Sequence, residues 1–171
     1  MQLILNAVIN RKWHYAETWT DKLVLIDEAM EHLEAESRSP HWSPGDDACF
    51  MFSDRRHDDG SDTPNNFLKV AVNSSTGFGA LIWFVSEDHP SRGGVFDHTW
   101  VSDNPNHPNF DPRVIADPGE PRFHDPKSAL EILKVREALE EFCRAGTGDR
   151  PESILWVRGY MNGYRLGEVS H

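Results

Sequence analysis

The sequence has few of the features that identify a secreted, membrane or metal-binding protein. Its two cysteines, Cys49 and Cys143, stand far apart and form no C-x-x-C pair, which argues against a disulfide framework or a thiolate metal site. No apolar run approaches the roughly 20 residues that a membrane helix needs. The first residues lack a basic leader and a small-residue cleavage site, and their pattern favours a strand. We therefore expect a cytoplasmic protein with buried thiols and no contact with a membrane.

Sequence motifs of common enzymes are also missing. There is neither a GxSxG nucleophile elbow nor a Walker phosphate loop. His32-Leu33-Glu34 matches the first half of the zinc-deaminase pattern, but the P-C-x-x-C that supplies the other zinc ligands does not follow. The stretch His57-Asp58-Asp59-Gly60-Ser61-Asp62 has residue types that suit calcium, but it misses the spacing of a calcium loop. We expect no catalytic residue, no metal and no cofactor.

Basic residues are scarce, because 17 lysines and arginines stand against 28 aspartates and glutamates, for a net charge of −11. Most of the excess lies in two loop-rich stretches. Residues 43–66 contain six acids and two bases, so −4, and residues 86–125 contain eight acids and three bases, so −5. Direct binding to nucleic acid is disfavoured, because its phosphates would be repelled. The acidity either serves solubility or forms a negative face that steers a basic partner.

The apolar pattern predicts several strands and two helices. A strand is expected at 2–9 and an amphipathic helix at 21–36, with Thr20 as the N-cap of the helix. The remaining expected elements are strands at 48–52, 67–73, 78–85, 95–102 and 154–157, an ordered proline-rich loop at 103–126, and a helix from 128 that stops at Gly146.

These elements combine into one expected domain that covers 1–171. Turn residues at 74–77 join the strands on either side into a hairpin, and similar links elsewhere imply an antiparallel meander. The expected fold class is α+β, with a mostly antiparallel sheet of about six or seven strands packed by two helices. The polar connection 54–65 is either a specificity loop or a neutral link.

Aromatic and acidic side chains are interspersed in the second acidic stretch. Protein interfaces favour aromatic anchors surrounded by charges that select the partner. Trp100 and Phe110 fit that role, with the alternative that each is a core residue that fixes the loop to the sheet. The candidate partner-binding residues are Asp58, Asp59, Asp62, Glu87, Asp88, Asp97, Trp100, Asp103, Phe110 and Asp111.

A series of short motifs resembles a known family. The motifs are Trp100-Val101-Ser102-Asp103-Asn104-Pro105, Phe110-Asp111-Pro112, Asp117-Pro118-Gly119 and His124-Asp125-Pro126, then Gly146-Thr147-Gly148, Arg150-Pro151, Trp156-Val157 and Asn162-Gly163. In order and spacing, the series is similar to immunity family one of bacterial polymorphic toxin systems. The resemblance is densest over 95–166 and extends weakly over the whole chain.

The resemblance implies a small cytoplasmic antitoxin that binds a cognate toxin domain and blocks it. In such systems the toxin is often a nucleic-acid deaminase and sometimes a nuclease-like domain. The resemblance supplies no catalytic residues and no list of contacts, because contacts vary between toxin–antitoxin pairs. An acidic chain suits this role, since a toxin that binds nucleic acid needs a basic groove.

Two other hypotheses come from different classes of protein. The first is a small metal-dependent or His/Asp-dependent enzyme whose site combines His98, His107, Asp111 and His124 in the 98–124 region. The second is a scaffold subunit that associates with itself through an exposed strand edge. A toxin-like domain encoded directly upstream would favour the immunity protein over both.

Overall fold

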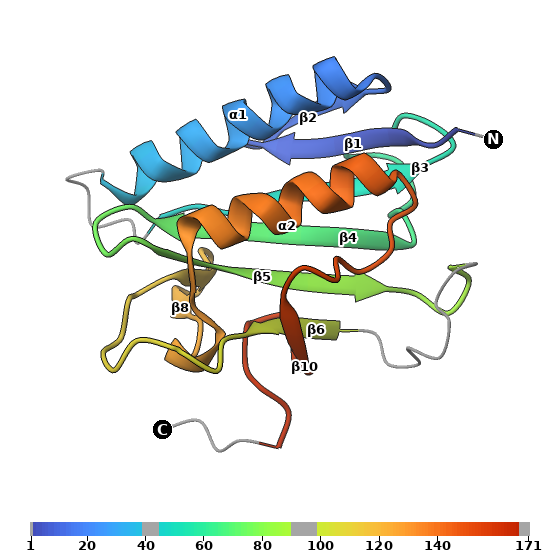
Figure 1. Cartoon of the computed structure of the whole chain (residues 1–171). Helices are drawn as coiled ribbons and strands as arrows, with labels where there is room; N and C mark the ends of the chain where they lie inside the picture. Colours follow the sequence, from blue (N-terminus) through green and yellow to red (C-terminus); the bar gives the residue numbers. More distant parts are fainter. Residues whose placement is uncertain (1, 39–44, 90–98, 168–171) are drawn as a thin grey trace.

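The computed structural model describes residues 2–38, 45–89 and 99–167 of the 171. Within these ranges the chain forms two helices and a mostly antiparallel sheet, which confirms the expected α+β class. The seven strands along the sheet follow the order β2-β1-β3-β4-β5-β6-β10, and a short strand β9 pairs with β5 (Figure 1). Their bounds are β1 Ile4–Ile9, β2 Lys12–Ala16, β3 Ala48–Ser53, β4 Asn66–Asn73, β5 Phe78–Val85, β6 Thr99–Asp103, β9 Leu130–Glu131 and β10 Leu155–Arg158.

The predicted hairpin is present as β4 and β5, which pair along their whole length from Asn66↔Val85 to Asn73↔Phe78. The turn closes where the Gly77 backbone N–H donates to the carbonyl of Asn73 at 2.9 Å. Gly77 has a φ of +83°, a backbone conformation that glycine adopts without strain. The alternating apolar residues of β4 therefore point to one face, as the period of a strand requires.

The helix α1 (Trp19–Ser37) begins slightly earlier than predicted. Its N-cap is Thr18 rather than Thr20, because the Thr18 hydroxyl accepts a hydrogen bond from the Asp21 backbone N–H. A β-region φ and ψ at Thr18 fits this role, whereas Thr20 already lies inside the first turn.

The helix α2 (Ile132–Ala145) begins later than the predicted residue 128. A 3₁₀ turn (Pro126–Ser128) and the strand β9 come first, because Leu130 and Glu131 pair with Gly79 and Phe78 of β5. The predicted stop is confirmed: Gly146 takes a left-handed φ of +72° as the C-cap.

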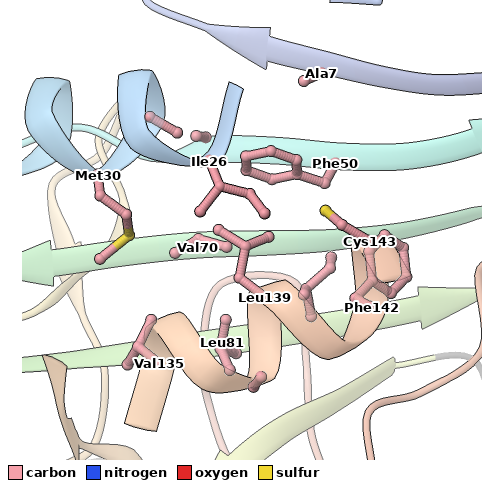
Figure 2. Packing of buried hydrophobic residues seen from close by; sticks show 14 of the residues in the cluster. Ala7, Ile26, Met30, Phe50, Val70, Leu81, Val135, Leu139, Phe142 and Cys143 are labelled. Atoms are coloured by element: carbon pink, nitrogen blue, oxygen red, sulfur yellow. The ribbon is translucent and has the colours of Figure 1, made fainter. Parts of the chain in front are cut away.

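Both helices cover the same face of the sheet (Figure 1). Figure 2 shows Ile26 of α1 and Leu139 of α2 close to Val70 of β4, with Met30 toward one end of this cluster and Phe142 toward the other. These side chains are at most 4 % exposed, and burying each one contributes about 1.5–3 kcal/mol to folding. The largest part of the hydrophobic core therefore lies between the sheet and the two helices.

Part of the opposite face of the sheet, over β4 and β5, is covered by the long loop that follows β6. This loop contains a two-stranded ribbon, β7 (Ile115–Asp117) with β8 (Arg122–Phe123). Val114 and Ile115 pack on Ala71 and Ala80 of the hairpin in a second, smaller cluster. The strands β2, β7, β8 and β9 were not predicted.

Neither α1 nor α2, the helices of the described ranges, has the length and apolar character needed to cross a bilayer. Cys143 is buried as expected, whereas Cys49 is half-buried. The first part of the predicted strand 95–102 lies outside the described residues, and β6 contains its second part.

Candidate partner-binding surface

The connection 54–65 is fixed to the sheet by one buried asparagine. Asn6 of β1 is fully buried on the face opposite the helices. Its amide nitrogen donates to the Arg55 carbonyl at 3.1 Å, and its oxygen accepts from the His57 backbone N–H at 2.7 Å. The connection is therefore an ordered loop whose start is positioned by β1.

A second group of contacts orders the middle of this loop. The buried His57 ring contacts the Ser53 hydroxyl at 2.7 Å and the Asp62 carbonyl at 2.5 Å through its two nitrogens. The Asp58 carboxylate accepts from the Gly60 N–H at 2.9 Å, as in an Asx turn. The Trp13 indole of β2 donates to the Asp59 carboxylate at 2.8 Å. The three predicted aspartates 58, 59 and 62 therefore lie on a loop with a defined backbone.

The end of β5 brings the second acidic segment to this loop. The Ser86 backbone N–H donates to the Asn65 carbonyl at 2.9 Å, which joins the segment after β5 to the end of the loop. The His89 ring lies 3.0 Å from the Thr147 carbonyl, which connects the same segment to the corner after α2. Glu87 and Asp88 are exposed between these two attachments.

These segments enclose a hollow of about 640 Å³, which we call the acidic hollow. It is lined by 15 residues that include Asp54, Arg55, His57, Asp62, Phe84 and Asp88. Asp62 is 88 % exposed and pairs with Arg55 at 3.1 Å. Within the described ranges, the carboxylates of Asp54, Asp58, Asp59, Glu87 and Asp88 form no ion pair. The surroundings of the hollow therefore carry uncompensated negative charge.

The remaining predicted residues lie toward the other end of β5. Phe110 is 50 % exposed and meets Phe78, the first residue of β5, edge-on with ring centroids 5.9 Å apart. The exposed Asp111 accepts from the Arg113 backbone N–H at 2.9 Å. Phe78 and Phe84 are six residues apart in β5, so about 20 Å separates the two groups. The structure therefore divides the candidate residues into two sites.

Two candidates have contacts within the fold, and one cannot be placed. Asp103 pairs with Arg165 at 2.8 Å and so fixes the C-terminal segment to the end of β6. The half-buried Trp100 packs against the main core, and the Arg150 guanidinium lies 4.5 Å from its ring centroid. Asp97 lies outside the described residues.

The residues of the alternative enzyme hypothesis are also placed in part. His98 lies outside the described residues, and His107 is exposed with its Nδ1 at 2.9 Å from the Pro108 carbonyl. His124 is buried, and this burial, with a smaller contribution from Lys69, lowers the pKa of its imidazole to about 3. Among the described residues, no group of three or more His, Cys, Asp and Glu side chains could hold a metal ion.

Sequence reasoning missed several residues that shape the acidic hollow. His57 and His89 are buried. The His57 ring holds the loop 54–65 together, the His89 ring contacts the distant Thr147, and Phe84 provides an apolar wall. Asn6 gave the one available signal, because a polar residue between apolar neighbours in a strand needs buried hydrogen-bond partners.

Comparison with protein families gives a match over most of the chain. The family model described as immunity protein Imm1 matches residues 14–158, which is most of the 171-residue chain. No curated protein and no solved structure matches the chain.

Proposed function

The chain belongs to the Imm1 family of immunity proteins, and from this premise we propose that it binds a cognate bacterial toxin domain and neutralises it without catalysing a reaction. The family match over residues 14–158 is the observation that carries the proposal. We further propose that the toxin acts on nucleic acid, as a deaminase or a nuclease-like domain, and that both proteins meet in the cytoplasm.

The charge of the chain supports this choice of partner. A domain that acts on nucleic acid needs basic residues to bind phosphates. The carboxylates of Asp58, Asp59, Glu87 and Asp88 lack ion-pair partners within the described ranges, so they remain free to attract such a surface. In this proposal the acidic hollow and its neighbouring carboxylates form one part of the contact with the toxin.

The test is coexpression with the toxin domain encoded in the neighbouring reading frame, followed by affinity measurement. The chain should restore growth and copurify with the toxin as a one-to-one complex. The paired substitution Glu87→Gln and Asp88→Asn should weaken binding about five- to tenfold at low ionic strength, because two attractive charges are lost.

A matched control removes two acids from a different region. Glu17→Gln with Glu31→Gln changes the net charge equally at exposed positions beside and on α1, and it should leave the affinity nearly unchanged. If the wild-type chain does not protect growth when it is coexpressed with the toxin domain, the proposed function is wrong. Equal weakening by both pairs would instead show that only the total charge matters.

A further inference from the structure

A second hollow lies between α2, β10 and the loop after β6. It encloses about 360 Å³, and its apolar lining consists of Phe78, Pro105, Pro108, Leu130, Ile154 and Leu155. We call it the apolar hollow. These residues come from four separate parts of the chain, so only the folded protein presents them together.

Two exposed apolar side chains border the apolar hollow. Leu155 is 57 % exposed in the wall of the hollow. Phe110 is 50 % exposed and rests edge-on against Phe78. It lines an adjoining hollow of about 380 Å³, and Pro108 is common to both hollows. A contiguous apolar surface of this kind is characteristic of an interaction site.

The charges at the rim of the two hollows indicate the chemistry of the partner. Glu131, Asp111 and Asp125 line the hollows and form no ion pair within the described part of the chain. The two hollows are lined by two basic residues, Lys127 and Lys134, of which Lys134 is paired with Glu137 at 3.4 Å, so acids outnumber bases there. The rim therefore attracts positive charge, while the floor favours apolar side chains.

The backbone around the apolar hollow is held in place before any partner binds. The Asn104 side chain donates to the Ala129 carbonyl at 2.8 Å, and its backbone N–H donates to the Lys127 carbonyl at 2.8 Å. The ion pair between Asp103 and Arg165 fixes the same corner. A preformed hollow loses little conformational entropy on binding, which favours high affinity.

We propose that the apolar hollow is the main anchoring site for the toxin, and that it receives an aromatic or aliphatic side chain flanked by lysine or arginine. This inference rests on the proposed function and adds to it the location and chemistry of the central contact. Interfaces concentrate their binding energy in such desolvated pockets, while charged residues around them exclude water and select the partner.

The test truncates the exposed apolar side chains and measures binding of the toxin domain from the neighbouring reading frame. Phe110→Ala with Leu155→Ala should weaken the affinity about thirty-fold or more, the effect of removing a binding hot spot. The control pair is Val24→Ala with Leu133→Ala, which truncates side chains that are 58 % and 66 % exposed and do not line the apolar hollow. This control should retain wild-type affinity.

Two outcomes separate the inference from the proposed function. If both pairs bind the toxin as tightly as the wild type, the anchoring site is wrong and the proposed function stands. If the wild-type chain does not bind the toxin domain, the proposed function and the anchoring site both fail. Circular dichroism of each variant checks that the fold is retained.

A photo-crosslinking amino acid at position 155 gives an independent test that does not depend on a loss of affinity. It should form a covalent adduct with the toxin domain, whereas the same amino acid at position 133 should not. Adducts of position 155 with a second copy of the chain, in place of the toxin, would overturn the proposal and show that the hollow serves self-association.

Discussion

At the scale of single residues, the buried polar side chains determine where the loops lie. Asn6 and Asn66 are both at most 1 % exposed, and each satisfies backbone groups of a neighbouring segment. Asn66 donates to the Phe52 carbonyl at 2.8 Å and accepts from the Phe52 N–H at 2.9 Å. An unsatisfied buried backbone group costs about 1–3 kcal/mol, so these two asparagines restrict the loop 54–65 to one path.

The buried imidazole of His124 should make the free energy of unfolding depend on pH. The imidazole is buried near Lys69, and its pKa is lowered from 6.5 to about 3, with burial as the larger cause. The unfolded chain therefore binds a proton between these two pH values that the folded chain does not. This part of the free energy of unfolding is fully present above pH 6.5 and is lost as the pH falls toward 3, by about 1.4 kcal/mol per pH unit at most.

The measurement is the free energy of unfolding in urea between about pH 5 and pH 7. His124→Gln should reduce the slope of this free energy against pH, because it removes the group whose pKa differs between the folded and unfolded chain. Asp47 contributes with the opposite sign at lower pH, since burial raises its carboxyl pKa above 3.8 in spite of the ion pair with Lys69. An unchanged slope in His124→Gln would contradict the conclusion that the lowered pKa of His124 causes the pH dependence.

At the scale of elements, the regular apolar patterns predicted most of the strands and both helices. The β4–β5 hairpin and the end of α2 at Gly146 follow from alternation and turn chemistry that act over a few residues. β2 was missed because its sequence KWHYA has no run of apolar residues, and its pairing with β1 is a tertiary effect. The short strand β9 likewise exists only because β5 lies beside it.

The close approach of α2 to β5 depends on Gly79. A Cβ at this position would lie 2.7 Å from the Ala71 carbonyl oxygen and 3.0 Å from Cγ2 of Val135. Gly79→Ala should therefore lower the free energy of unfolding by about 1–3 kcal/mol, as overpacking of a core does. Urea denaturation measures the effect, and Gly60→Ala is the control, because its nearest neighbour would be 3.6 Å away in an exposed loop. Equal stability of the two variants would show that the hairpin accommodates the added methyl group without a loss of stability.

At the scale of the whole molecule, the sequence indicated that the candidate binding surface is acidic, but not that its residues are divided between two sites. The density of acids in 43–66 and 86–125 is visible in the sequence, and the loops that carry them do contribute to the acidic hollow. The second stretch divides between the two ends of β5, with Asp88 at one end and Asp111 at the other, and this could not be predicted because it depends on strand register and loop paths. The apolar hollow was also missed, since Phe78, Pro105, Leu130 and Leu155 converge only in the fold.

The two hollows should act on different steps of complex formation. In the proposed complex, the negative charge around the acidic hollow would attract a basic toxin over a distance limited by the Debye length, about 10 Å at 0.1 M salt. It should therefore raise the association rate at low salt, whereas the apolar hollow acts only after contact and should slow dissociation. About 20 Å separates their phenylalanines Phe84 and Phe78, which fits within one interface of about 800 Å² per partner.

Stopped-flow or surface-based kinetics against the toxin domain tests this division at several salt concentrations. Glu87→Gln with Asp88→Asn should lower the association rate and flatten its dependence on salt, with little change in dissociation. Phe110→Ala with Leu155→Ala should mainly accelerate dissociation and leave the salt dependence unchanged. If the charge variant changes dissociation alone, its carboxylates make direct, desolvated contacts with the toxin. The acidic hollow would then be part of the buried interface rather than a surface that guides the approach.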